Sequence, residues 1–249
     1  MLEFFNHYLF LPTLVVIILL VPLLSRTRRV WQTQRIPATY NLQPVELASA
    51  VAAHDQKASY VNEAMAALGF VPVTASEIRK PNSLVSFVLL RNPDDLSVAN
   101  VTVGSNSKSS TTYIEFTQEF TDGTSLNVNS SPRVGVFPKE ARKPVYRFPT
   151  MSVPELYAAF LKLRAGLSSG RSPVLSLSME DPVADLCCKL DEQTARLVAK
   201  GYLHRSVDEG THRLTFKGAF SFTFKLTSPW SEMINLAERA SSHRALEAA

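Results

Sequence analysis

Apolar residues follow three different spacings along this chain of 249 residues. Residues 4–25 are almost continuously apolar and include no Lys, Arg, Asp or Glu. Residues 44–69 repeat apolar side chains at steps of three and four, the period of an α-helix, with His54 on the same face. Residues 84–128 contain short apolar and alternating stretches separated by turn residues, which is typical of β-strands.

The continuous apolar segment is long enough to cross a bilayer. Its 22 residues would rise roughly 33 Å as a helix, about the thickness of the hydrocarbon core. A cleaved signal peptide would need basic residues before the segment and a small-x-small motif after it, and both are missing. A helix in a protein core is the other alternative. We predict a retained transmembrane helix over residues 4–25.

Basic residues flank this segment on one side only. Arg26, Arg28, Arg29 and Arg35 follow it, and no Lys or Arg precedes it. Because Lys and Arg concentrate on the cytoplasmic side of membrane helices, we expect a single-pass protein of the cell membrane with Trp31 onward in the cytoplasm. Residues 26–43 would form a juxtamembrane linker. The arginines would act as a stop-transfer signal or would also attract anionic lipid, making the bilayer a predicted partner.

The middle of the chain predicts an α+β domain over residues 44–167. A helix from Pro44 to Gly69 precedes strands at 84–91, 96–103, 111–120 and 124–131, with Asp122-Gly123 as a hairpin turn. The short connections predict an antiparallel meander, whose apolar face the helices would cover. Ser152 and Glu155 have the spacing of a capping box and begin a second helix that extends to about Leu167.

An irregular basic segment interrupts this domain at residues 129–149. It contains one acidic residue, Glu140, and five basic ones: Arg133, Lys139, Arg142, Lys143 and Arg147. Long irregular loops in compact domains are often functional or mobile. These five residues are therefore a candidate contact loop for anionic lipid or an acidic partner, with a solvated loop as the alternative.

A small C-terminal unit is expected over residues 174–240. Helical periodicity covers residues 181–200, and two strands at 202–207 and 212–216 flank the turn Asp208-Glu209-Gly210. Residues 218–226 alternate phenylalanines and are compatible with a strand or a helix. A final helix follows Trp230.

The stretch LVAKGYL (197–203), the acidic turn and RLTFKG (213–218) resemble the recognition helix and wing of a winged helix-turn-helix domain. The resemblance implies a winged-helix-like unit with Arg196, Lys200, Arg205 and Arg213 as the positions that would contact nucleic acid. Residues 180–217 contain six basic and seven acidic residues, however, including Asp191 and Glu192 on that helix. Since affinity for DNA depends on neutralising phosphates, we expect a unit that contacts protein rather than nucleic acid.

Composition agrees with this expectation. The sequence pI is about 9.1, but the four arginines after the apolar segment, less Glu3, supply +3 of the net charge of +4. The basic excess is therefore local and is weak support for a nucleic-acid footprint. The two cysteines, Cys187 and Cys188, are neighbours, which disfavours a disulfide and a zinc site.

Familiar catalytic patterns are missing from the sequence. It contains no G-x-S-x-G, phosphate-binding loop, G-x-G-x-x-G or H-E-x-x-H motif. His54 and Asp55 are chain neighbours and point apart on a helix, Glu115 and Glu119 are too far apart to act as a pair, and His204 and His212 have no third metal ligand. We predict no catalytic residues, no cofactor and no metal site, and an enzyme is disfavoured.

These patterns together predict a membrane-anchored interaction or scaffolding module that acts at the inner membrane face through a protein partner. Two alternatives stay open. One is a membrane-tethered winged-helix transcriptional regulator, which a strongly positive face near Arg196 to Arg213 would favour. The other is a ligand-sensing or hydrolase domain, which a polar pocket over the sheet would favour.

Overall fold

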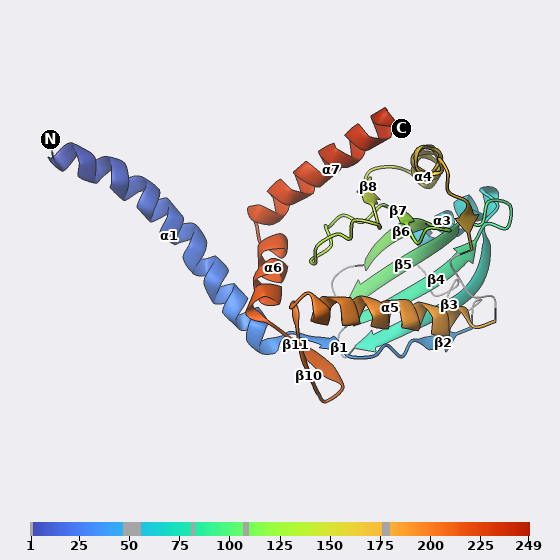
Figure 1. Ribbon diagram of the computed structural model, residues 1–249, viewed down its shortest axis with the longest axis horizontal. Helices are drawn as coiled ribbons and strands as arrows, with labels where there is room; N and C mark the ends of the chain where they lie inside the picture. The colour runs from blue at the N-terminus through green and yellow to red at the C-terminus, as the bar shows by residue number, and fades with distance from the viewer. Residues whose placement is uncertain (1, 47–55, 81–82, 107–109, 176–179) are drawn as a thin grey trace. The chain divides into compact units, whose positions relative to one another are not determined.

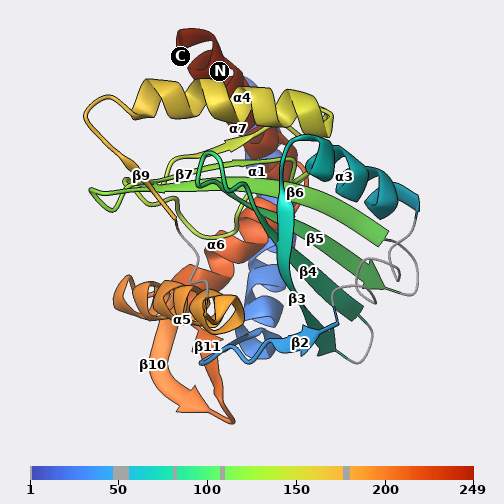
Figure 2. The same cartoon turned by 90° about the vertical axis from the view of Figure 1, so that its right-hand side faces the viewer.

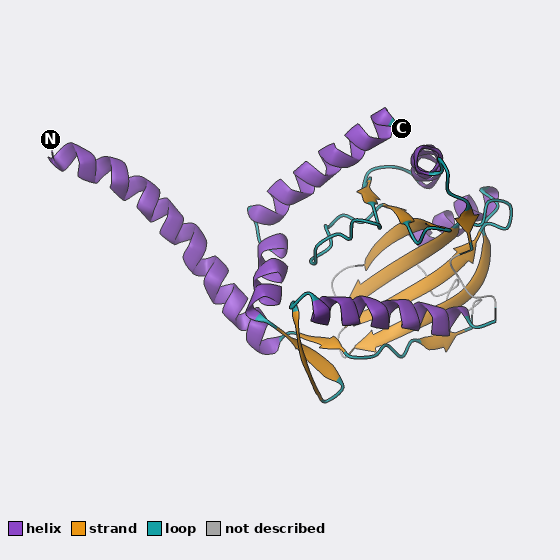
Figure 3. Cartoon of the chain, viewed as in Figure 1, coloured by secondary structure: helices purple, strands orange, loops and turns teal. Residues whose placement is uncertain are grey.

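The computed structural model of the chain describes residues 2–46, 56–80, 83–106, 110–175 and 180–249. Backbone contacts divide the chain into two compact units. Unit 1 contains Met1–Thr39, Gly135–Phe137 and Leu190–Ile234, and unit 2 contains Tyr40–Val134, Pro138–Lys189 and Asn235–Ala249. Each unit combines helices with a sheet (Figure 3), which confirms the predicted α+β class.

Unit 2 is built on a mixed sheet of eight strands. The strand order is β2-β3-β4-β5-β6-β7-β8, and β9 pairs with β6. The strands are β2 (Gln43–Val45), β3 (Val71–Lys80), β4 (Ser83–Arg91), β5 (Val98–Asn106), β6 (Ser110–Phe120), β7 (Ser125–Asn129), β8 (Val145–Arg147) and β9 (Pro173–Val174). Successive strands from β2 to β7 pair antiparallel, as predicted for β4 to β7, whereas β7 and β8 are parallel. The strand β8 lies inside the segment that was expected to be irregular.

Side-chain alternation places the main core of unit 2 on one face of this sheet. The helices α3 (Gln56–Ala67) and α4 (Val153–Leu167) cover that face (Figure 2). Among the fully buried side chains of this core are Met65, Phe116, Phe120, Leu126, Leu156 and Phe160. The capping box at α4 is confirmed, since the Ser152 N–H and hydroxyl donate to Glu155 Oε2 at 2.8 and 2.7 Å.

The predicted helix from Pro44 to Gly69 is wrong at its N-terminal end. Pro44 belongs to β2, where it pairs with Ser76 of β3. Because β2 is an edge strand, the missing N–H of a proline there costs little, and Pro44 is not the first residue of a helix. The described helix runs over Gln56–Ala67, and His54 lies outside the described residues. The sequence pattern also missed β3.

A hydrogen-bonded cluster fixes the β4–β5 turn to α4. The Tyr157 hydroxyl donates to Asp95 Oδ2 at 2.8 Å and accepts from Asn92 Nδ2 at 3.1 Å, and Arg164 Nη1 lies 2.9 Å from Asp95 Oδ2. Burial and the Asp95 carboxylate raise the pKa of Tyr157 to about 12. Burial alone would raise the pKa of Asp95, but hydrogen bonds from Ser97 and Tyr157 and the Arg164 charge outweigh it and lower that pKa.

Unit 1 is built on a three-stranded antiparallel sheet in the order β1-β11-β10. Its elements are α1 (Leu2–Thr33), β1 (Arg35–Pro37), the second half of α5 (Pro182–Ala199), β10 (Leu203–Asp208), β11 (Thr211–Leu214), α6 (Phe216–Leu226) and the start of α7 (Trp230–Ala248). The core contains Leu197, Leu203, Leu214 and Ala219. Residues 218–226, left open between strand and helix, are helical, and β1 was not predicted.

Gly218 sets the position of α6 against the hairpin. A Cβ at this residue would lie 2.1 Å from the Tyr202 carbonyl oxygen, so only glycine allows the observed approach. The Thr215 side chain caps α6 by accepting from Gly218 N at 3.1 Å, and its hydroxyl also lies 2.7 Å from the Gly201 carbonyl, to which it donates. The start of α6 is therefore tied to the residues that connect α5 to β10.

The prediction of a transmembrane helix over residues 4–25 is wrong, and with it the single-pass, cell-membrane and cytoplasmic-domain assignments. In the part of the chain that the structure describes, no helix combines the length and apolar character needed to cross a membrane. α1 instead lies alongside α6 (Figure 1) and buries Leu23 and Thr27. Arg26, Arg28 and Arg29 are exposed on this protein-packed part of the helix.

Substitution of Gly218 by alanine is expected to destabilise unit 1 by about 2 kcal/mol or more, because the new methyl group must displace the Tyr202 backbone. Urea denaturation followed by circular dichroism measures the loss. Gly166→Ala is the matched control in α4, since its Cβ would lie 3.5 Å from Ala249 Cβ, an ordinary contact. Equal stability of the Gly218→Ala variant and the native protein would contradict this account.

Candidate interaction surface

An exposed aromatic stripe runs along α6 of unit 1. Phe216, Phe220 and Phe224 recur every fourth residue and therefore lie on one side of the helix, next to the row of Ala219 and Thr223, which are buried. Phe216 is 52% exposed and Phe220 is 37% exposed. We call these three phenylalanines and Trp230, at the start of α7, the α6 aromatic face.

Ring contacts hold the α6 aromatic face in place. Phe220 stacks on Phe224 with ring centroids 5.8 Å apart, and Phe224 stacks on Trp230 at 5.2 Å. At the other end, Trp31 of α1 meets Phe216 edge-on at 6.4 Å. Met233, one turn into α7, is 61% exposed. Since stacked rings lose little further entropy on binding, this face is ordered before any partner arrives.

The net charge of the chain resides in unit 1. This unit contains ten Lys and Arg residues against six Asp and Glu, a net charge of +4, whereas unit 2 contains sixteen of each. The exposed Arg26, Arg28 and Arg29 belong to α1, and the fourth arginine of the predicted flank, Arg35, lies on β1. The α6 aromatic face therefore belongs to a positively charged unit.

The predicted contact loop is mostly attached to its own domain. Arg147 is 2% exposed and donates to the Ser131 carbonyl at 3.0 Å and to Asn235 Oδ1 at 3.1 Å. Burial lowers the pKa of Arg147, and the Glu238 carboxylate opposes that effect. Glu238 lies 3.7 Å from Arg147 Nη1 and 3.1 Å from Lys139 Nζ, so α7 anchors both residues.

The other three members of that loop do not gather into one surface. Lys143 Nζ lies 3.9 Å from Glu140, and the Arg142 carbonyl accepts from Ser125 N at 2.9 Å. Arg133 and Arg142 are exposed. The sequence pattern missed Glu238 and Asn235, since nothing local to residues 129–149 indicates that α7 returns to this segment.

The four residues that the winged-helix resemblance places in contact with nucleic acid differ in their surroundings. Arg196 lies 3.3 Å from Glu192, one turn earlier on α5, while Lys200, Arg205 and Arg213 are exposed. The exposed positions of α5 include one acid and no base. They are Ala184, Cys188, Glu192, Gln193, Ala195 and Ala199. A helix that reads DNA needs basic or amide side chains there, and α5 offers only Gln193 among these positions.

A polar network occupies the sheet face of unit 2 opposite the main core. Glu115 of β6 lies between Asn100 of β5 and Asn129 of β7 in the strand register. Asn127 and Thr117 make hydrogen bonds to its carboxyl group. Burial raises the pKa of Glu115 above its ordinary value of 4.5 and outweighs those bonds.

Hydrogen bonds engage only part of this network. Asn129 Nδ2 donates to Asn127 Oδ1 at 2.7 Å, whereas Asn100 Oδ1 is buried without a hydrogen-bond partner. Glu119, further along the same strand face, lies 3.1 Å from Lys189 Nζ. Tyr113, two residues earlier on the same strand face, has a pKa that burial and the Glu115 charge raise.

Two other candidate groups also lack catalytic or metal-binding geometry. His212 is buried and its Nδ1 lies 2.9 Å from the His204 carbonyl, whereas the His204 side chain is exposed, so the two imidazoles do not face each other as a metal pair. Cys187 and Cys188 are both free thiols on α5. Within the described ranges, no cluster of three His, Cys, Asp or Glu residues could hold a metal ion.

Comparison of the chain with protein-family models, with curated proteins and with solved structures found no match. The α6 aromatic face must therefore be interpreted from its own geometry. The sequence did contain a signal for it, because Phe216, Phe220 and Phe224 have helical spacing. The simultaneous alternation of Phe220, Phe222 and Phe224 hid that signal.

Replacing Glu115 with glutamine is expected to flatten the pH dependence of stability. Because the folded-state pKa lies above the unfolded value, the native protein binds more protons and loses stability as pH rises from about 4.5 through the folded pKa. At pH 8 the Glu115→Gln variant should have a higher free energy of unfolding than the native protein, because it places no charge at this buried position. Urea denaturation at several pH values measures this difference.

Glu119→Gln is the control for that experiment, since it removes a half-exposed ion pair from the same strand face. Its effect on the free energy of unfolding should stay below about 1 kcal/mol. Parallel pH profiles for the native protein and the Glu115→Gln variant would show that Glu115 is not desolvated in the folded state.

Proposed function

We propose that the chain is a protein-interaction module that binds an acidic, amphipathic protein segment on the α6 aromatic face. The observation that carries this proposal is the stripe of Phe216, Phe220 and Phe224, stacked on Trp230 and left partly exposed to solvent. Most proteins keep large aromatic groups away from water, and exposed apolar patches mark interaction sites. Aromatic residues are also enriched at the cores of protein interfaces.

The charge of unit 1 selects the type of partner. A net charge of +4 attracts an acidic segment and speeds its approach. The same charge disfavours pairing of this face with itself, because a symmetric dimer would bring two positive units together. Apolar anchors at helical spacing on the partner would match the spacing of the phenylalanines.

Unit 2 serves as the neutral, folded body of the module. Its main core buries Phe70, Phe116, Phe120, Phe148 and Phe160, and its charged groups are balanced in number. On the polar face, Asn127 and Thr117 make hydrogen bonds to the Glu115 carboxyl group, and Asn129 donates to Asn127. These features favour a structural role for unit 2 over the ligand-sensing or hydrolase alternative.

Site-specific photocrosslinking tests the proposal. A benzophenone amino acid replaces Phe220 in one variant and Tyr60 in another, and the crosslinked peptides from the source cells are sequenced. Tyr60 is 58% exposed on α3 of unit 2 and provides a matched aromatic control. We expect Phe220 to capture a segment that is rich in Asp and Glu and has apolar residues at helical spacing.

Loss of the stripe should abolish that capture. A Phe216→Ser variant carrying the crosslinker at Phe220 should recover at least about tenfold less of the same segment, with thermal unfolding as a check on folding. Capture of the same peptides from Tyr60, or of only a second copy, lipid or nucleic acid from Phe220, would overturn the proposal.

The topology of unit 1 supports a second candidate function, a winged-helix regulator. A helix (α5) leads into the β10–β11 hairpin and a helix (α6) follows, as the winged-helix resemblance implies, and a third strand (β1) pairs with β11. Lys200, Arg205 and Arg213 are exposed. The exposed side of α5 and the acidic turn at Asp208 and Glu209 weigh against contact with phosphate.

Fluorescence anisotropy with labelled duplex DNA distinguishes this second candidate. We expect weak binding at low salt that disappears at physiological salt and is equal for different sequences, as for nonspecific attraction to a positive unit. Sequence-dependent binding that survives physiological salt and is lost in an Arg205→Gln variant would favour the regulator instead.

A further inference from the structure

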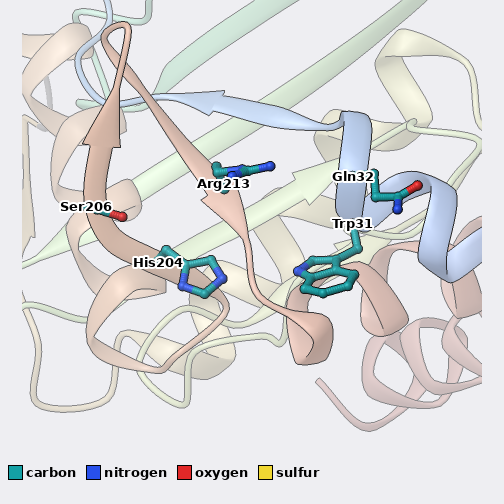
Figure 4. Close-up of a pocket in the computed structure, with 5 residues that line it drawn as sticks. All are labelled: Trp31, Gln32, His204, Ser206 and Arg213. Atoms are coloured by element: carbon teal, nitrogen blue, oxygen red, sulfur yellow. The ribbon is translucent and has the colours of Figure 1, made fainter.

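A pocket of about 490 Å³ opens on the outer face of the unit 1 sheet. Its lining residues come from three segments: Trp31 and Gln32 from the end of α1, His204 and Ser206 from β10, and Arg213 from β11. Figure 4 shows the Arg213 side chain extending from its strand toward the end of α1. The volume lies within the range of small-molecule sites.

Strand geometry explains why these side chains face outward. Leu203 and Leu214 pair across the hairpin and point into the core of unit 1. Arg213, next to Leu214, and His204, next to Leu203, therefore point to the opposite face. The register shifts between Leu203 and Val207, and such an irregularity re-aims the side chains beside it.

The pocket carries positive charge that the protein does not balance. Arg213 is directly opposite Arg35 in the β1–β11 register. Neither arginine has a carboxylate partner among the residues that the structure describes, and Arg35 instead donates to the Gln32 and Gln34 carbonyls at 3.0 and 3.1 Å. Like charges directly across a strand pair destabilise a sheet, so an anion at Arg213 would relieve this repulsion.

Trp31 supplies a flat apolar surface beside that charge. It is 41% exposed, and the interplanar angle of 82° with Phe216 means that the two rings meet edge to face rather than stack. An exposed indole is a good platform for a planar ring, and nucleobases stack well on it. Gln32 and Ser206 add a carboxamide and a hydroxyl, which can pair with donors and acceptors on the edge of such a ring.

We propose that this pocket binds a mononucleotide, with the base on Trp31 and the phosphate on Arg213. A guanidinium matches a phosphate through paired N–H donors, and the indole matches the base through its face. The pocket lining does not include the α6 aromatic face, although Trp31 meets Phe216 of that face edge-on, and a bound nucleotide would make unit 1 a nucleotide-responsive part of the protein.

Tryptophan fluorescence provides the test. The chain has two tryptophans, so a Trp230→Phe variant leaves Trp31 as the only indole reporter. Titration with adenosine monophosphate should quench this signal to saturation. Adenosine, which lacks the anion, and ribose 5-phosphate, which lacks the base, should each bind at least about tenfold more weakly, because each loses one of the two contacts.

Substitutions at two arginines separate a built site from general attraction. Arg213→Gln should weaken the nucleotide at least about tenfold, whereas Arg205→Gln, on the same hairpin but outside the pocket lining, should change binding less than about twofold. Thermal unfolding of both variants confirms that unit 1 stays folded. The affinity should also fall with added salt for the nucleotide but not for adenosine.

Several results would overturn the assignment. If both arginine substitutions weakened nucleotide binding equally, that binding would be general electrostatic attraction and not recognition by this pocket. Ribose 5-phosphate binding as tightly as the nucleotide would remove the role of Trp31. Tighter binding of benzoate than of adenosine monophosphate would assign the pocket to aromatic carboxylates, and tighter binding of an oligoadenylate would assign it to a nucleic-acid strand. No saturable quenching by the nucleotide would end the proposal.

Discussion

The close approach of α6 to the Tyr202 backbone determines what unit 1 presents to its surroundings. Gly218 permits that approach, and Thr215 fixes the first turn of the helix by capping it. Once these residues are in place, the rotation of the helix is decided. Ala219 and Thr223 turn inward, and Phe216 and Phe220 turn to solvent. One backbone contact therefore leads to the exposed aromatic face on which the proposed function rests.

The two units divide structure and recognition between them. Unit 2 buries phenylalanines such as Phe116 and Phe120 in the core that α3 and α4 cover, balances its charges, and fixes its turns with internal groups such as the Tyr157–Asp95 pair. Unit 1 has a small core, a net charge of +4 and exposed rings on α1 and α6. An interaction module needs both parts, since binding surfaces carry apolar and charged groups that reduce the stability of the protein that displays them.

The spacing of apolar residues and the turn residues within short stretches of sequence correctly predicted several helices and strands. The strands β4, β6 and β7, the capping box at Ser152, the helix α5 and the hairpin that follows it all agree with the sequence reading. The β1–β11 pairing and the Arg147–Glu238 contact join residues far apart in the chain, and spacing alone contains no information about them. Of the candidate site, the phenylalanines were visible but their common face depended on whether residues 218–226 were helix or strand.

The failed membrane prediction has a related physical cause. A run of Leu, Ile and Val satisfies the requirement for lipid and equally satisfies the requirement for burial against another helix. In α1, Leu23 of that run and Thr27 just beyond it are buried beside α6, whereas Ile18, Leu20, Val21 and Leu24 are exposed. Thr27 is fully buried although it is polar, and the hydropathy of the segment could not indicate which side of the helix faces α6.

Residue-level footprinting of aromatic side chains, compared between the purified protein and intact source cells, tests the central claim most directly. If the α6 aromatic face is occupied by a partner, Phe216 and Phe220 should be labelled strongly in the purified protein and much less in cells, while Tyr60 of unit 2 should be labelled equally in both. Equal labelling of Phe216 and Phe220 in the two settings would contradict the account, because the face would then have no partner where the protein works.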